Sequence, residues 1–307
     1  MIYMYNKVKG IMKWGMMLCL VALMPWQAFA TDFTGSGTEN SPYLIATSDD
    51  LKKLSDQVNA GTNYKGMFFR LETDLDLAGS NWSPIGHKEA KYFAGNFDGN
   101  GHTIKNMTIS VSDDASTDAV AYGLFGYTKG YVRNLNMTGA RITLNTTDSN
   151  ANRVLRAGLL CGYVGYDISE SLYGAIWGCD IAGEITGTLK NSQNNFADTY
   201  IGGMVGRMNI PASIYQCHAK VTLHITNGRY VGGIAGYADT SMSPADITDE
   251  NQIPNSESRP KISYLFDCAA DVDMVLSSQS TVSAGGICGA NKAAYLLACA
   301  SSGTMTC

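Results

Sequence analysis

The stretch Gly202-Gly203-Met204-Val205-Gly206 decides the fold, because related blocks recur along the chain. In each block, glycines bracket small or apolar residues. The other blocks are Gly123-Leu124-Phe125-Gly126, Gly158-Leu159-Leu160-Cys161-Gly162, Gly232-Gly233-Ile234-Ala235-Gly236 and Gly285-Gly286-Ile287-Cys288-Gly289. Allowing for insertions, the unit is roughly thirty residues long, and a repeat of this size indicates a stacked, repetitive architecture.

A second repeated block follows each glycine block and alternates apolar with polar residues. Val221, Leu223 and Ile225 show this strand periodicity. One unit cannot bury its own apolar face, so neighbouring units must stack to form a core. Glycine suits a tight corner where coils crowd and a side chain would clash. The pattern therefore predicts an all-β fold, a right-handed parallel β-helix, over residues 67–307.

The final repeat ends abruptly. The chain stops at Cys307 directly after the last repeat block, whereas a finished solenoid normally ends in a polar cap. We therefore expect a β-helix that is incomplete at the C-terminus. Either the gene product is truncated, or the molecule associates through the exposed C-terminal coil. The longest insertions, at about 145–152, 191–198 and 239–261, are predicted to be loops.

Residues 1–30 have the features of a signal peptide. Lys7, Lys9 and Lys13 precede an apolar run from Met16 to Met24, and Ala28-Phe29-Ala30 fits a cleavage site. The protein is therefore expected to be exported, to the cell surface or the extracellular space. Removing this segment moves the formal net charge from -5 to about -8, which argues against nucleic acid as a partner. No later apolar run is long enough for a membrane span in the mature chain.

Residues 31–66 are predicted to form an N-terminal cap with a helix at about 48–59. Thr47 or Ser48 can cap the helix, with Asp50 completing a capping box, and Gly61 supplies the stop. The apolar face would consist of Leu51, Leu54 and Val58. Such a helix can cover the first coil and its open strand edge.

Several segments resemble bacterial GLUG-repeat proteins. The glycine blocks resemble the GLUG repeat, and the similarity covers nearly all of residues 42–305. The N-terminal segments that carry it are Asp74-Leu75-Asp76-Leu77, Trp82-Ser83-Pro84-Ile85-Gly86 and Phe93-Ala94-Gly95-Asn96-Phe97-Asp98-Gly99-Asn100-Gly101-His102-Thr103-Ile104. The resemblance implies a parallel β-helix on a secreted or cell-surface bacterial protein. It brings no set of catalytic residues.

One repeat position is a candidate for ligand binding. Tyr127, Tyr163 and Tyr237 directly follow the last glycine of their blocks, and Arg207 and Ala290 hold the equivalent places. If this position points outward, Tyr127, Tyr163, Arg207 and Tyr237 form a stripe that can contact a glycan. If it points inward or lies flat, the tyrosines serve as corner packing.

Other candidate sites have simpler interpretations. Asp98 and His102 could act as an acid–base pair, but Asp98 and Asn100 are expected to bond their own backbone in a turn. The cysteines lack metal-ligand spacing and are expected to fill an internal ladder. No metal site, cofactor or catalytic residue is predicted.

The favoured function is a non-catalytic module for adhesion or for binding a glycan or host protein. The first alternative is a polysaccharide-active β-helix enzyme, a lyase or glycosidase, whose acids would assemble from distant positions. The second is a structural stalk for a missing C-terminal domain.

Overall fold

The computed structural model describes residues 33–112, 119–146, 154–167, 170, 172–189, 198–209, 212–239, 264–278, 281–292 and 294–307. The predicted signal peptide and most of the three predicted loops lie outside these ranges. The chain divides into two compact units, Met1–Thr34 and Gly35–Cys307. Every element named below belongs to the second unit.

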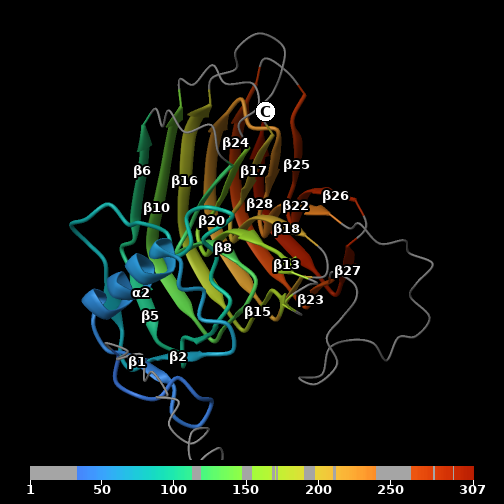
Figure 1. The fold of residues 1–307 in the computed structure, drawn as a ribbon. Helices are drawn as coiled ribbons and strands as arrows, with labels where there is room; N and C mark the ends of the chain where they lie inside the picture. The colour runs from blue at the N-terminus through green and yellow to red at the C-terminus, as the bar shows by residue number, and fades with distance from the viewer. Residues whose placement is uncertain are drawn as a thin grey trace, which may run out of the picture. The chain divides into compact units, whose positions relative to one another are not determined.

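The described residues of this unit form four parallel sheets. Sheet 1 consists of β1 (Tyr43–Ile45), β2 (Phe68–Leu71), β4 (Asn96–Asp98), β9 (Tyr131–Arg133), β15 (Ala175–Trp177), β19 (Ser213–Tyr215), β23 (Tyr264–Phe266) and β27 (Tyr295–Leu297). Sheet 2 consists of β3 (Leu75–Asp76), β5 (Thr103–Lys105), β6 (Thr108–Ser112), β10 (Asn136–Thr146), β16 (Asp180–Leu189), β20 (His218–Thr226), β24 (Ala269–Ser277) and β28 (Ala300–Thr306). In Figure 1 the long strands of sheet 2 stand side by side in chain order.

The two remaining parallel sheets are smaller. Sheet 3 consists of β7 (Val120–Tyr122), β11 (Leu155–Gly158), β17 (Thr199–Gly202), β21 (Tyr230–Gly232) and β25 (Ser283–Gly285). Sheet 4 consists of β8 (Phe125–Thr128), β12 (Cys161–Val164), β18 (Val205–Asn209), β22 (Ala235–Asp239) and β26 (Cys288–Asn291). A separate antiparallel pair joins β13 (Tyr166–Asp167) to β14 (Leu172–Tyr173).

Each repeat visits the sheets in one order, from sheet 3 through sheets 4 and 1 to sheet 2. We call one such passage a coil, and β7 to β10 form the first. The glycine blocks stack in register, because Gly158 pairs with Gly202, Gly202 with Gly232, and Gly232 with Gly285. The prediction of an all-β structure built from parallel, stacked repeats is therefore confirmed.

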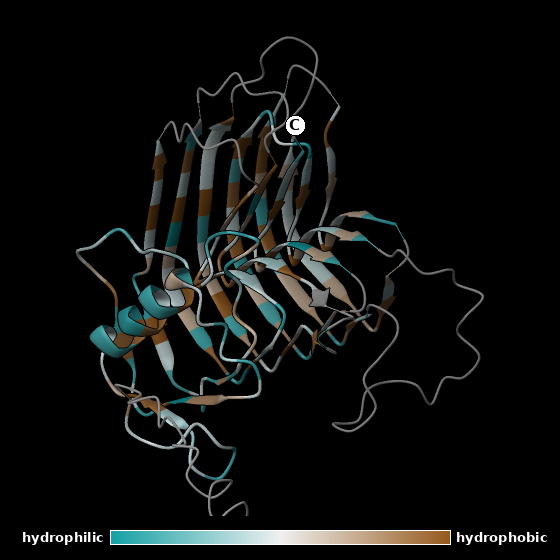
Figure 2. Cartoon of the chain, viewed as in Figure 1, coloured by the Kyte–Doolittle hydropathy of each residue, from teal (hydrophilic) through white to brown (hydrophobic). Residues whose placement is uncertain are grey.

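The core consists of columns of apolar side chains that continue from coil to coil. In sheet 2, Ile142, Ile185, Leu223 and Met274 are in register and at most 1% exposed. Figure 2 shows apolar and polar residues following one another along the strands. Met305 continues this column in the last coil but is 47% exposed. Association through that coil stays a prediction.

The turn between sheets 1 and 2 uses left-handed backbone in every repeat. In successive coils the residue directly after the sheet 1 strand has a φ between 51° and 60°. Its backbone amide still donates to the next coil, as Gln216 does to the Phe266 carbonyl at 2.9 Å. The residues at this position are Asn134, Gly178, Gln216, Asp267 and Ala298.

Helix α2 (Ser48–Ala60) confirms the predicted helix and extends it by one residue. Thr47 is the N-cap, and the capping box with Asp50 is present. Gly61 ends the helix with a φ of 119°. The predicted apolar face is buried, and Ser55 Oγ donates to the Ser83 carbonyl at 2.8 Å. The outer surface of α2 is largely hydrophilic (Figure 2).

Candidate ligand-binding surface

The predicted stripe is a continuous column on sheet 4. Tyr163 pairs in register with Tyr127 on one side and with Arg207 on the other, and Arg207 pairs with Tyr237. Exposure rises along the column. Tyr127 is 1% exposed and Tyr163 is 9% exposed, whereas Arg207 and Tyr237 are half-buried. The two rings nearest the N-terminus are therefore packed within the protein, and the column opens toward solvent at Arg207.

A second column on sheet 3 lies against the first. Arg156 is in register with Tyr200, which is in register with Tyr230. The Arg156 guanidinium lies 5.4 Å from the ring centroid of Tyr127 and 5.0 Å from that of Tyr163. Its Nη1 donates to the Tyr127 hydroxyl at 2.5 Å. Together we call these seven residues the aromatic–arginine ladder: Tyr127, Tyr163, Arg207 and Tyr237 on sheet 4, with Arg156, Tyr200 and Tyr230 on sheet 3.

The same arrangement continues toward the C-terminus. Arg207 lies 5.1 Å from the Tyr200 ring centroid and 5.6 Å from that of Tyr237. The Tyr200 and Tyr230 rings stack with centroids 5.3 Å apart, and Tyr237 meets both edge-on. Arg207 Nη2 also pairs with Asp239 at 3.0 Å. Each of the two guanidinium groups thus lies over the faces of two tyrosine rings.

Glycine brings the two columns together. A Cβ atom on Gly158, at the end of β11, would lie 2.5 Å from the carbonyl oxygens of Cys161 and Met204. On Gly162, within β12, it would lie 2.7 Å from the Tyr122 nitrogen in the preceding coil. Only a residue without a side chain allows this approach. The same blocks that mark the repeat therefore create the ladder.

Burial changes the acidity of the ladder tyrosines. It raises the pKa of Tyr127 to about 12, although Arg156 acts in the opposite direction. Burial likewise raises the pKa of Tyr163, Tyr200 and Tyr237. All four hydroxyls are therefore protonated at neutral pH and can donate a hydrogen bond.

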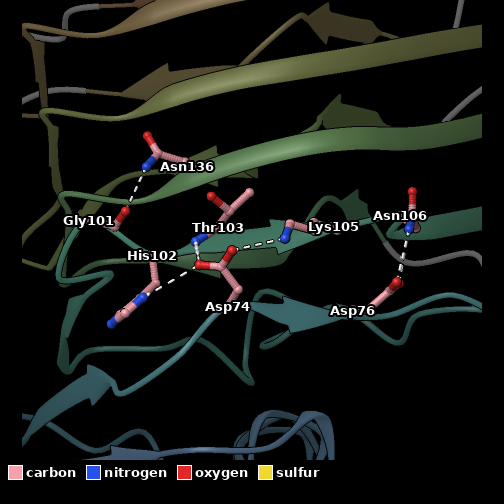
Figure 3. A network of polar contacts seen from close by, with 8 residues as sticks. All are labelled: Asp74, Asp76, Gly101, His102, Thr103, Lys105, Asn106 and Asn136. Carbon is pink, nitrogen blue, oxygen red and sulfur yellow. Dashed lines mark hydrogen bonds and ion pairs between the residues drawn. The ribbon is translucent and has the colours of Figure 1, made fainter.

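Asp98 and His102 do not pair with each other. Asp98 Oδ2 accepts from Arg133 Nε at 2.8 Å, and its Oδ1 accepts from the Asn100 amide at 2.8 Å, which confirms the local turn expected of Asp98. The expectation for Asn100 is wrong, because its Nδ2 donates to the distant Leu71 carbonyl at 3.3 Å. His102 Nδ1 instead lies 3.5 Å from Asp74 Oδ1 (Figure 3).

Asp74 is the centre of a polar network between β3 and β5 (Figure 3). It accepts from Lys105 Nζ at 2.9 Å and from the Thr103 amide at 3.0 Å. These contacts lower the pKa of Asp74 to about 2. The network fixes strand register at an exposed surface.

Four cysteines form an internal ladder between sheets 1 and 2, and no disulfide is present among the cysteines that the structure describes. Each thiol contacts the carbonyl two residues earlier, as Cys217 does with Tyr215 at 3.2 Å. The members are Cys179, Cys217, Cys268 and Cys299. Within the described ranges no cluster of His, Cys, Asp or Glu could hold a metal ion, and no helix has the length and apolar character needed to cross a bilayer.

Sheet 1 carries another aromatic column, which the sequence interpretation did not single out. Trp177 and Tyr215 stack with centroids 5.6 Å apart and ring planes 4° apart, and Tyr131 meets Trp177 edge-on. Because the two rings face each other, the contact uses the faces that would stack on a sugar. This column therefore stabilises neighbouring coils, as the Tyr200–Tyr230 stack does within the ladder.

Arg156, Tyr200 and Tyr230 were also missed. They occupy the position two residues before the first glycine of their blocks, where the first and last coils have Ala121 and Ser283. Aligning the repeats on their first glycine, and comparing the residues before it as well as those after it, would have found them.

No protein-family model matches the chain. A halomucin from Haloquadratum walsbyi is 25% identical over 227 residues, which is 73% of this chain and 2% of that protein. A protein of Evansella cellulosilytica with the provisional name Gly-rich membrane protein is 36% identical over 118 residues, or 36% of this chain and 12% of that protein. The chain therefore spans only a small part of these relatives.

One solved structure is similar in fold. It is the crystal structure of a Bacteroides ovatus protein provisionally named an immunoglobulin A1 protease. It matches with a TM-score of 0.52 and 20% identity, covering 87% of this chain and 77% of that chain. A likeness at this identity shows the fold alone.

Proposed function

We propose that the chain is an exported surface or secreted module of the GLUG-repeat type that binds a glycan without catalysing a reaction on it. The finer fold that we propose is a right-handed parallel β-helix. The constant order of four parallel sheets supports it, as does the strong preference of parallel crossover connections for the right hand. The names of the two relatives and the apolar N-terminal segment support export.

The aromatic–arginine ladder carries the proposal for binding. It presents ring edges, hydroxyls and guanidinium groups in successive coils, and its C-terminal half, around Arg207 and Tyr237, is half-buried. Such a surface combines apolar contact with fixed hydrogen-bond donors, which is what recognition of a sugar requires. The repetition from coil to coil suits a polymeric ligand.

Two carboxylates beside the ladder, Asp239 and Asp198, favour binding over catalysis. Asp239 pairs with Arg207, and Asp198 pairs with Arg229 and accepts from the Tyr200 hydroxyl. A glycosidase needs one carboxyl group that stays protonated and a second that acts as base or nucleophile. Asp239 and Asp198 are instead held in ion pairs with arginine, and these contacts support the surface.

Binding to polysaccharides, measured by calorimetry on the purified chain, tests the proposal. Tyr237→Ala should lower the affinity for a bound glycan about tenfold, the loss expected for one aromatic contact. Tyr131→Ala, which removes a half-buried tyrosine from sheet 1, is the control and should bind as the parent does. Release of reducing ends or unsaturated uronates would favour the enzyme, and binding to host protein but no glycan would favour an adhesin for proteins. Failure to bind any glycan or host protein would favour the structural stalk.

A further inference from the structure

Arg156 is a buried cation without a carboxylate partner among the residues that the structure describes. It is 6% exposed, and among the described residues it contacts the Tyr127 hydroxyl and the rings of Tyr127 and Tyr163. Its Nε is buried and has no hydrogen-bond partner. Its Nη2 has no acceptor among the described residues either, but this nitrogen remains in contact with solvent. A buried charge in this state is unfavourable unless an acceptor reaches it.

The hydroxyls beside Arg156 are donors as well. Tyr127 accepts a hydrogen bond from Arg156, and Tyr163 accepts one from Asn209 Nδ2 at 3.2 Å. Each hydroxyl therefore has its own proton left to donate. Within the described part of the chain, the cluster of Arg156, Tyr127 and Tyr163 thus offers donors and no matching acceptor.

The other arginines of this region differ from Arg156. Arg207 pairs with Asp239 at 3.0 Å, and Arg229 pairs with Asp198. The protein therefore neutralises the neighbouring guanidinium groups with its own carboxylates. Arg156 is the exception, at the place where the ladder passes from buried to half-buried side chains.

We propose that Arg156, with the hydroxyls of Tyr127 and Tyr163, binds an oxyanion of an acidic glycan, a carboxylate or a sulfate. This inference rests on the proposed function and names its class of ligand. A planar guanidinium and two hydroxyl donors match a group that only accepts hydrogen bonds. The ligand chain then continues along the more exposed half of the ladder, toward Arg207 and Tyr237. Because the whole protein is acidic, with a net charge of -5, recognition depends on this local cluster.

Calorimetric titration of the purified chain with three polymers separates the possible ligands. Polygalacturonate offers carboxylates, dextran sulfate offers sulfates, and dextran is the neutral control. We expect one or both acidic polymers to bind, and Arg156→Met to weaken that binding about tenfold or more, as loss of a charge-assisted contact implies. Arg229→Met removes the same charge from an arginine that already has a carboxylate partner, and it should have a much smaller effect.

Thermal unfolding supplies a second readout that does not depend on catalysis. The acidic polymer should raise the Tm of the parent but not that of Arg156→Met. Tyr163→Phe, which removes only a hydroxyl, gives a milder test if Arg156→Met fails to fold, and it should weaken binding in the same direction. Equal binding by Arg156→Met and the parent, or equal binding of dextran, would overturn the acidic-glycan inference while the proposed function stood. Failure of all glycans to bind would overturn both.

Discussion

Gly206 packs directly against the backbone of Ala157 in the preceding coil. A Cβ atom on Gly206 would lie 2.6 Å from the Ala157 nitrogen. The equivalent atoms on Gly236 and Gly289 would lie 2.5 Å from backbone nitrogens in their own preceding coils. A backbone atom cannot rotate away from such a contact. Close packing by the neighbouring coil, and not an unusual φ, therefore requires glycine at the last position of each block.

Gly206→Ala should therefore destabilise the fold. Forcing a methyl group into this contact must separate two coils, and overpacking of this kind costs about 1–3 kcal/mol. Chemical denaturation followed by circular dichroism measures the loss. The matched control is Gly286→Ala, because its Cβ would meet only the Ser301 side chain within the same, last coil and no backbone of a neighbouring coil. A loss for Gly286→Ala as large as for Gly206→Ala would contradict the backbone-contact explanation.

Much of the stacking was predictable from sequence because glycine is the only residue that fits these contacts. The turn between sheets 1 and 2 was not predictable in the same way. Its left-handed position holds Asn134, Gly178, Gln216, Asp267 and Ala298 in successive coils. Asparagine and glycine favour this conformation, but glutamine and alanine do not. Stacking of the coils imposes the conformation there, so no local sequence signal marks it.

Thr47→Ala should lower the free energy of unfolding by about 1 kcal/mol. The Thr47 side chain accepts from the Asp50 amide at 3.1 Å, and alanine leaves that amide without its cap. Urea denaturation measures the change. Thr47→Ser retains the hydroxyl and should stay close to the parent. If serine were as destabilising as alanine, the methyl group and not the cap would be responsible. The helix end was predictable because capping depends on adjacent residues.

The candidate site was predictable only in part. Counting from the last glycine placed Tyr127, Tyr163, Arg207 and Tyr237 in one column, and the strand register agrees. The burial of Tyr127 was not predictable, because the side chains that cover it come from distant positions such as Tyr92. Arg156 lies in sheet 3, whereas the tyrosines lie in sheet 4. It contacts them only because the glycine turn between these two sheets brings the two columns together.

The thiols should differ sharply in reactivity. Cys307 is exposed, whereas Cys161 is fully buried and burial raises the pKa of its thiol. Because the thiolate is the reactive form, iodoacetamide at pH 8 should modify Cys307 in the native protein and reach Cys161 only after unfolding. Peptide mass spectrometry assigns the modified sites, and a sample in guanidinium chloride is the control. Rapid modification of native Cys161 would show that sheet 4 opens readily.

Asp74→Asn should reduce stability at neutral pH but not in acid. The Lys105 ammonium and the Thr103 amide lower the folded-state pKa of Asp74 to about 2, below its ordinary value of 3.8. A lowered pKa contributes stability that is present above pH 3.8 and is lost as the pH falls toward about 2. The difference between parent and variant should therefore shrink over that interval. Its size at neutral pH should be small, because the Asp74 side chain is 47% exposed and solvent screens the ion pair. Urea denaturation at several pH values measures the difference, with Glu39→Gln as an exposed control. A constant difference from pH 7 to pH 2 would mean that Asp74 acts through packing and not through its charge.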